Sequence, residues 1–197
     1  MPPRRATIKR KTKETQLTVE IDLDGAGKFQ GKVGVPFLEH MLDLLARHSL
    51  IDLTVSGSGD LAIDPHHTVE DLGIVLGQAL REALGDKRGI TRYGAVIIPM
   101  DEALARCALD VCARPFLRYR ANIPKERIGD YDVELTEEFF RALAVNAALT
   151  LHLELLYGSN GHHAVEALFK AFARALRQAL AIDPREAGAV PSTKGVL

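Results

Sequence analysis

The chain has 197 residues, and 25 Lys and Arg against 26 Asp and Glu give it a formal net charge of −1. This balance argues against attachment to nucleic acid or a membrane surface through bulk charge. Hydrophobic residues make up 47% of the chain, which is enough for a substantial core, and no stretch approaches the ~20 apolar residues that span a bilayer. We therefore expect one globular domain or two fused small units, and the absence of a signal-peptide pattern predicts a cytoplasmic protein.

In the first half, alternating and β-branched residues predict strands over 15–23 and 31–35, with glycines at the turn between them. Pro36 suits the first position of a helix that carries His40. A further strand is expected over 50–56, and a longer helix follows it.

The second half is predicted to repeat this order. Strands are expected near 103–112 and 115–121, a helix near 136–147, a strand near 149–156 and a helix near 162–181. Sheet and helix segments in both halves predict an α+β fold in which each sheet packs against helices.

The two cysteines, Cys107 and Cys112, fall within one predicted strand. Their odd spacing places them on opposite faces of that strand, so that they cannot form a disulfide. Two unbridged cysteines favour a reducing, intracellular compartment.

Two adjacent histidine pairs indicate an internal repeat. Residues 66–70 read His-His-Thr-Val-Glu and residues 162–166 read His-His-Ala-Val-Glu, and the apolar positions that follow match at the same offset. Those positions have the spacing of a helix with one buried face. We therefore expect one domain made of two duplicated units, each of about 90 residues. The units cover about 1–92 and 93–185, and a C-terminal tail covers 186–197.

The repeated motif has the residue types and spacing of a metal site. Residues four apart on a helix lie on one face, so the first histidine of each pair and the following glutamate can bind one cation together. The second histidine points about a quarter-turn away and can reach the metal of the other half. Metal 1 is expected to take His66, Glu70, His163 and Glu138, and metal 2 to take His162, Glu166, His67 and His40.

Imidazole and carboxylate donors suit manganese, iron, cobalt or zinc better than calcium. Four protein ligands would leave coordination positions open for a substrate, which suits catalysis. The alternative is a solvated histidine pair next to a glutamate that complements the helix dipole. Two copies in register favour the metal site.

Segments 37–43, 66–71, 100–104, 162–172 and 191–197 closely resemble the imidazoleglycerol-phosphate dehydratase family of histidine biosynthesis, and the resemblance covers nearly the whole chain. It implies a two-repeat fold related to ribosomal protein S5 domain 2. It also implies a homo-oligomer of 24 subunits whose active sites are shared between neighbours, with two Mn²⁺ ions per site. The implied reaction is the dehydration of D-erythro-imidazoleglycerol phosphate to imidazole acetol phosphate by a carbon–oxygen lyase.

In this reaction the substrate's own imidazole is the available electron sink, and two cations on its nitrogens would favour the imidazolate form. The resemblance assigns acid–base catalysis and substrate contact to Glu14, and substrate contact to His48. It also nominates phosphate-binding residues, since guanidinium groups suit phosphate oxygens. They are Arg92, Arg114, Lys170, Ser192, Thr193 and Lys194. Without the resemblance, these basic residues would be read as surface solubilisers and Glu14 as a solvated carboxylate.

One position departs from the family pattern. Where the pattern reads Glu-His-Phe-Phe, residues 137–140 read Glu-Glu-Phe-Phe. Glu138 therefore stands in place of a histidine ligand, and it adds a negative charge and harder oxygen donors. We expect Glu138 to ligate metal 1. The alternatives are that it turns away while water fills the position, or that the chain is a paralogue disabled there.

Two other classes of protein compete with this interpretation. The basic N-terminal residues could bind RNA, although Lys and Arg also protect an exposed sheet edge. These residues are Arg4, Arg5, Lys9, Arg10, Lys11 and Lys13. A hydrolase with a metal-activated water is the second class, but no nucleophile or leaving-group constellation accompanies the ligands. The prediction is an enzyme for a small phosphate substrate, without nucleic acid or membrane partners.

Overall fold

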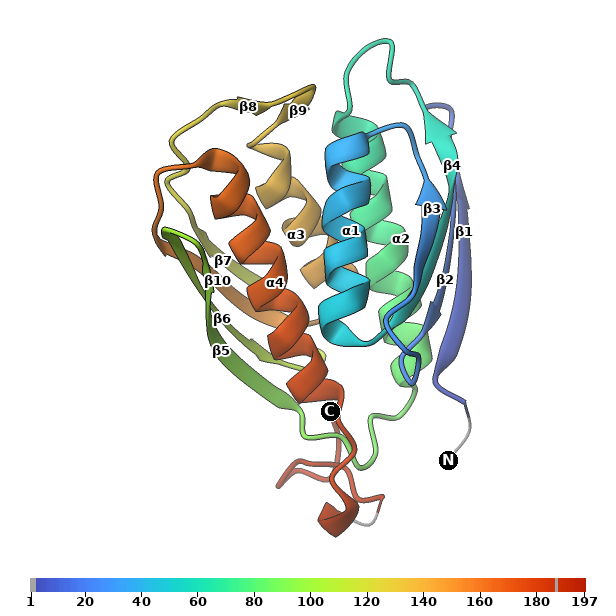
Figure 1. Cartoon of the computed structure of the whole chain (residues 1–197). Coiled ribbons are helices and arrows are strands. Elements are labelled where there is room, and N and C mark those ends of the chain that lie inside the picture. Colours follow the sequence, from blue (N-terminus) through green and yellow to red (C-terminus); the bar gives the residue numbers. More distant parts are fainter. Residues whose placement is uncertain (1–2, 187) are drawn as a thin grey trace.

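The computed structural model describes residues 3–186 and 188–197. Each half of the chain contributes a four-stranded sheet and two helices, and the two sheets enclose the four helices (Figure 1). The predicted α+β fold with an internal duplication is confirmed. No helix in the described part of the chain combines the length and apolar character needed to cross a membrane.

The first half forms a mixed sheet with two helices on one face. Its elements are β1 (Arg5–Lys11), β2 (Thr15–Asp22), β3 (Phe29–Lys32), α1 (Pro36–Ser49), β4 (Asp52–Gly59) and α2 (His66–Leu84). The strand order is β1-β2-β4-β3, with β3 parallel to β4 and the other neighbours antiparallel. Alternate residues of β2 are buried, as expected for a strand with one face on the core.

The second half repeats this arrangement. Its elements are β5 (Tyr93–Met100), β6 (Ala103–Asp110), β7 (Phe116–Arg120), β8 (Arg127–Ile128), β9 (Tyr131–Asp132), α3 (Leu135–Asn146), β10 (Thr150–Tyr157) and α4 (Gly161–Leu180), followed by a short 3-10 helix at Pro184–Glu186. The order β5-β6-β10-β7 matches the first sheet, with β7 parallel to β10. The short hairpin β8–β9 is an insertion before α3.

The predicted order of elements omits β1 and β5, which are the outer strands of the two sheets. In β1 only Ala6 is buried, while β5 reads as a nearly continuous apolar run. The basic run after Ile8 in β1 and the apolar run in β5 therefore hide the polar–apolar alternation in the sequence, although burial alternates along both strands. Most of the basic N-terminal run lies in β1, where Arg5 bonds Asp22 and Arg10 bonds Asp71, as expected for a charged edge strand.

The placement of both cysteines in one strand is wrong. Strand β6 ends at Asp110, and Ala113 adopts a left-handed backbone with φ 58°, so Cys112 lies in the turn beyond the strand. Both cysteines are buried and unbridged, as predicted. The Sγ atom of Cys112 lies 3.3 Å from Thr150 Oγ1 in β10.

Each helix of the first half packs on a helix of the second half: α2 on α3, and α1 on α4. A Cβ atom at Gly73 or Gly77 of α2 would lie 2.7 Å from a backbone carbonyl oxygen of α3, so only glycine permits this approach. Where α3 meets α4, the rings of Phe140 and Phe169 lie 4.8 Å apart. All four helices begin at the same end of the molecule (Figure 1), so their first turns form one surface.

Candidate metal centre and anion site

The surface formed by the helix starts carries the repeated histidines. Side-chain oxygens hold the first turn of two helices: Asp64 accepts from the backbone N–H of His66 at 2.8 Å, and Asn160 accepts from that of His162 at 2.9 Å. These are the side chains that favour helix starts. His40 lies on α1 one turn from its beginning.

Three predicted ligands of metal 2 come together here. His40, His162 and Glu166 each offer a ligand atom within 4.8 Å of the others. Oε2 of Glu166 lies 3.2 Å from Nε2 of His162 and 3.7 Å from Nε2 of His40. The Glu166 side chain is only 8% exposed, whereas both rings reach the surface. Two imidazoles around a buried carboxylate form a donor set that fits a transition-metal ion.

Glu166 is held in its ionised form by a neighbour on the same helix. Burial opposes its ionisation, but the hydrogen bonds and charges of Lys170 and then His162 together outweigh that cost and leave the pKa of Glu166 below its usual value. The Nζ atom of Lys170 lies 2.5 Å from Oε1 of Glu166 and 3.2 Å from Sδ of Met100. Lys170 therefore lies beside the metal ligands.

Two predicted site residues meet at the start of α2. Nε2 of His67 lies 4.0 Å from Oε1 of Glu14, which is in the turn between β1 and β2. Thr12 holds this turn by accepting the backbone N–H of Glu14. Nδ1 of His67 faces Asp60, 3.0 Å from Oδ2, and this hydrogen bond raises the pKa of His67. The predicted base and a predicted metal ligand thus lie side by side.

His163 has a similar surrounding at the start of α4. Its Nδ1 lies 2.7 Å from Oε2 of Glu102, and the same carboxylate accepts the backbone N–H groups of Ser159 and Asn160. The hydrogen bond from His163 is the main reason why the pKa of Glu102 falls to about 2. Neither Glu102 nor Asp60 is predicted as a site residue. The match between Glu14 and Glu102 at corresponding places of the two halves was the available signal.

The remaining predicted ligands do not gather within one chain. His66 begins α2, with its ring centroid 6.1 Å from that of His67, and Glu70 follows one turn later. Glu138 lies in the first turn of α3, with Oε2 3.8 Å from Nε of Arg141. In the described ranges, no second group of three ligand atoms is as compact as the His40–His162–Glu166 group. Within the described part of one chain, therefore, neither His67 nor His163 joins the compact ligand group with residues of the other half that the sequence predicts.

A second cluster contains the predicted phosphate-binding arginines. Both nitrogens of the Arg92 fork bond the carboxylate of Asp110, at 2.7 and 3.1 Å, and Arg114 lies 3.6 Å from the same carboxylate. Nη1 of Arg92 donates to the carbonyl oxygen of Pro191 at 2.8 Å. This bond joins the arginines to the segment that carries Ser192, Thr193 and Lys194. Each nitrogen of Arg92 thus has an acceptor, whereas the side chain of Arg114 is 67% exposed and leaves its guanidinium accessible to an anion.

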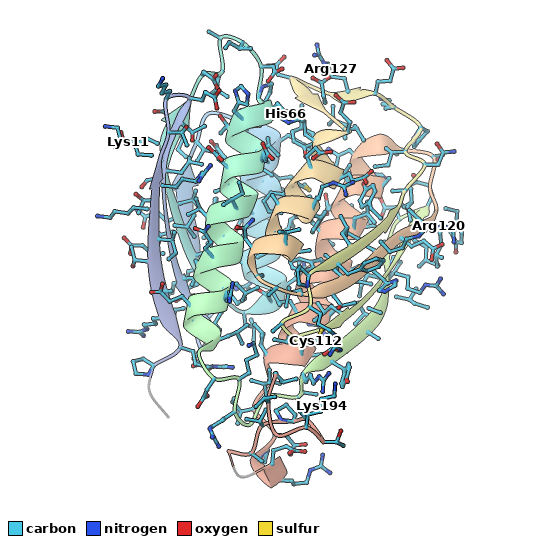
Figure 2. All side chains as sticks on the ribbon, turned by 180° about the vertical axis from the view of Figure 1, so that it is seen from behind. Lys11, His66, Cys112, Arg120, Arg127 and Lys194 are labelled. Carbon is cyan, nitrogen blue, oxygen red and sulfur yellow. The ribbon has the colours of Figure 1, made fainter. Side chains whose placement is uncertain are left out.

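The two clusters lie at opposite ends of the helices. The backbone N–H of Arg92 donates to the carbonyl oxygen of Ala179, near the end of α4, whereas His162 lies at its beginning. At ~1.5 Å per residue the helix separates these levels by ~25 Å. Figure 2 shows His66 near one end of the helices and Lys194 near the other. A small substrate therefore cannot touch both clusters of one chain.

His48 lies in the last turn of α1. Burial lowers the pKa of His48, and the charges of Lys170 and Arg174 on α4 lower it further. The neutral imidazole is therefore favoured at this position. Among the described residues, no side-chain hydrogen bond or ion pair joins His48 to either cluster, and its substrate contact stays a prediction.

The fold and its clusters define a class: a duplicated α+β protein with a histidine–carboxylate cluster at the helix starts and an arginine cluster around Asp110 at the opposite end. The sequence profile of imidazoleglycerol-phosphate dehydratase matches residues 33–176. The chain belongs to the imidazoleglycerol-phosphate dehydratase family.

Relatives that carry this name match along nearly their whole length. The protein of Rhodopseudomonas palustris (strain TIE-1) is 59% identical over 194 residues, covering 98% of both chains. The protein of Dinoroseobacter shibae is 60% identical over 194 residues, covering 98% of this chain and 100% of its own.

Solved structures of the family share the fold. The dehydratase of Staphylococcus aureus is 45% identical, with a TM-score of 0.83, over 91% of this chain and 99% of its own. The Pyrococcus furiosus enzyme in complex with (S)-C348 is 39% identical, with a TM-score of 0.82, over 96% of this chain and 100% of its own.

Proposed function

We propose that this protein dehydrates D-erythro-imidazoleglycerol phosphate to imidazole acetol phosphate in histidine biosynthesis, as a metal-dependent carbon–oxygen lyase of the cytoplasm. Membership of the dehydratase family supports the substrate and the reaction. The His40–His162–Glu166 group is the observation that carries the metal dependence. Two Mn²⁺ ions per site would supply Lewis acidity that favours the imidazolate form of the substrate.

The chain's own residues supply proton transfer and binding. The reaction breaks the carbon–oxygen bond of one hydroxyl and removes a proton from the neighbouring carbon, so that water leaves and the resulting enol becomes a ketone. In this proposal Glu14 takes that proton; its half-exposed carboxylate and its position next to His67, a predicted metal ligand, support the role. Lys170 keeps Glu166 ionised as a ligand. Arg92, Arg114 and the tail from Ser192 to Lys194 would bind the phosphate.

The distance between the two clusters supports a site that is built from more than one copy of the chain. The metal ligands and the arginines of one chain lie ~25 Å apart along α4, which is too far for one small substrate. We propose that the arginines of a second copy complete the site, in the 24-subunit assembly that the family resemblance implies. The same assembly would bring His67 and His163 to ligand groups from which the single chain keeps them apart.

The test is turnover by the full chain. Protein loaded with Mn²⁺ is incubated with imidazoleglycerol phosphate, and imidazole acetol phosphate is measured by NMR; chelation of the metal should abolish its formation. An assembled, manganese-loaded protein that forms no product would contradict the proposed function.

The role of Glu138 has its own expected outcome. If Glu138 ligates manganese, Glu138→Ala should lower the manganese retained after dialysis, and Glu138→His should preserve or raise it. Loss of the exposed pair with Arg141 costs under about 1 kcal/mol, so the fold should persist. Glu137→Ala is the matched control, because Glu137 also pairs with Arg141 but is not a predicted ligand. Equal retention by the Glu138→Ala and Glu137→Ala variants would show that Glu138 does not ligate.

A further inference from the structure

The second histidine of each pair has a carboxylate on the same ring nitrogen. Nδ1 of His67 lies 3.0 Å from Asp60, and Nδ1 of His163 lies 2.7 Å from Glu102. We infer that Asp60 and Glu102 are positioning residues that keep the proton of these imidazoles on Nδ1 and so leave the Nε2 lone pair for a metal ion. This inference rests on the proposed metal-dependent function.

The chemistry of imidazole explains the consequence of this contact. A neutral imidazole carries one N–H, and an ionised carboxylate only accepts hydrogen bonds. A carboxylate at Nδ1 therefore selects the tautomer with the proton on Nδ1, and it also orients the ring. Such carboxylate–histidine pairs behind a metal typically change metal affinity by about 10- to 100-fold.

The carboxylate of Glu102 is itself held in place. One oxygen accepts the backbone N–H of Asn160 at 2.7 Å and that of Ser159 at 3.2 Å, while the other oxygen receives His163. With both oxygens engaged, the group cannot turn away from the ring. Asp60 follows directly after β4 and its side chain is 21% exposed; within the described residues its Oδ1 is buried without a hydrogen-bond partner, so burial rather than a second hydrogen bond limits its movement.

The Nε2 atoms of both rings have no hydrogen-bonded partner within 3.5 Å among the described residues, and both side chains are partly exposed where the helices begin. Nε2 of His67 faces Glu14 at 4.0 Å, and Nε2 of His163 faces Asp101 at 3.9 Å. The side chains of the two histidines keep 35% and 26% of their exposure. Each ring thus has an anchoring carboxylate on one side and an accessible nitrogen on the other.

The two halves reach this arrangement with residues from different places. Asp60 comes from the loop between β4 and α2, whereas Glu102 comes from the turn between β5 and β6. The residue of the first half that corresponds to Glu102 is Glu14, which faces the other nitrogen of its histidine. Duplication alone would have placed the two carboxylates at matching positions. What the two halves share is a carboxylate at Nδ1 of the second histidine, although it comes from a different loop in each half. Its recurrence indicates that the site requires this contact.

Two substitutions of Glu102 distinguish a role in fixing the tautomer of His163 from a role in stabilising the turn between β5 and β6. In Glu102→Gln the amide oxygen can still accept the N–H of Asn160, but the amide N–H₂ now faces Nδ1 and favours the proton on Nε2. We expect Mn²⁺ affinity to fall by about 10- to 100-fold, at least as much as in Glu102→Ala. The thermal midpoint of the metal-free protein should fall in Glu102→Ala and stay near the wild-type value in Glu102→Gln. Asp60→Asn should weaken Mn²⁺ binding by a similar factor.

Matched controls come from carboxylates that contact arginines elsewhere. Glu154→Gln removes the negative charge that faces Arg120 in the second sheet, and Asp86→Asn removes the negative charge that faces Arg88. Both variants should bind Mn²⁺ as the wild type does. A larger loss in Glu102→Ala than in Glu102→Gln, parallel to a loss of thermal midpoint, would mean that Glu102 only supports the turn, and it would overturn the inference.

The tautomers of His67 and His163 can be measured directly in the metal-free protein. Magic-angle-spinning NMR of ¹⁵N-histidine-labelled, metal-free protein, recorded well above the imidazole pKa, should show protonated Nδ1 for His67 and His163 in the wild type, and a changed signal in the Gln and Asn variants. Wild-type protein that binds Mn²⁺ but carries the proton on Nε2 would overturn this inference alone. Wild-type protein that binds no Mn²⁺ would overturn the proposed function and this inference with it.

Discussion

His162→Ala should lower kcat/KM for imidazoleglycerol phosphate by about a thousandfold or more while leaving the fold intact. A catalytic metal ion stabilises transition-state charge by several kcal/mol, and each ~1.4 kcal/mol changes the rate tenfold. His162 supplies one of the three ligand atoms that the chain brings together. Its side chain is 42% exposed, so its removal should change stability by less than ~1 kcal/mol.

Steady-state kinetics at several Mn²⁺ concentrations, together with calorimetric titration of the metal, measure this effect. His152→Ala is the control, since His152 lies on the exposed face of β10 beside Phe116 and away from the helix starts. Its kinetics and metal affinity should match those of the wild type. Unchanged Mn²⁺ affinity in the His162→Ala variant would remove His162 from the metal site.

Co-expression of two inactive variants, His162→Ala and Arg114→Glu, should produce assemblies that are active. Arg114 is 67% exposed, so charge reversal there should preserve the fold. Loss of a charged hydrogen bond worth ~1.5–3 kcal/mol, with added repulsion of the phosphate, should cost at least ~100-fold in kcat/KM. If a site takes its metal ligands from one copy and its arginine from another, random mixing leaves about a quarter of the sites complete.

Activity of purified mixed assemblies, compared with each variant alone, measures this rescue. A chain that carries both substitutions serves as the control and should stay inactive. Mixed assemblies no more active than the average of the two variants would show that each chain builds its own site. That result would contradict the two-copy proposal without touching the metal ligands.

Local sequence patterns were sufficient for the helices and for most strands. The helix that starts at Pro36, and the two long helices that start at or next to the histidine pairs, lie where periodicity and turn residues predict them. Such patterns work because helix faces and strand faces depend on residues a few positions apart. Strand β5 was not predicted, because its nearly continuous apolar residues lack the alternation by which a half-buried strand is recognised.

The amino-acid order alone established the duplication, the residue types of a metal site and the pairing of His162 with Glu166, because all of these depend on near neighbours on a helix. The repeat had also assigned His40 to that pair, and the structure brings the three ligand atoms together. The folded chain was needed to place Glu102 behind His163 across 61 positions of sequence, and to separate the arginines from the metal ligands. These relations join side chains that only the packing of distant elements brings together or holds apart. For the same reason, the proposal that a second copy completes the site rests on the tertiary structure, which places the two clusters at opposite ends of α4.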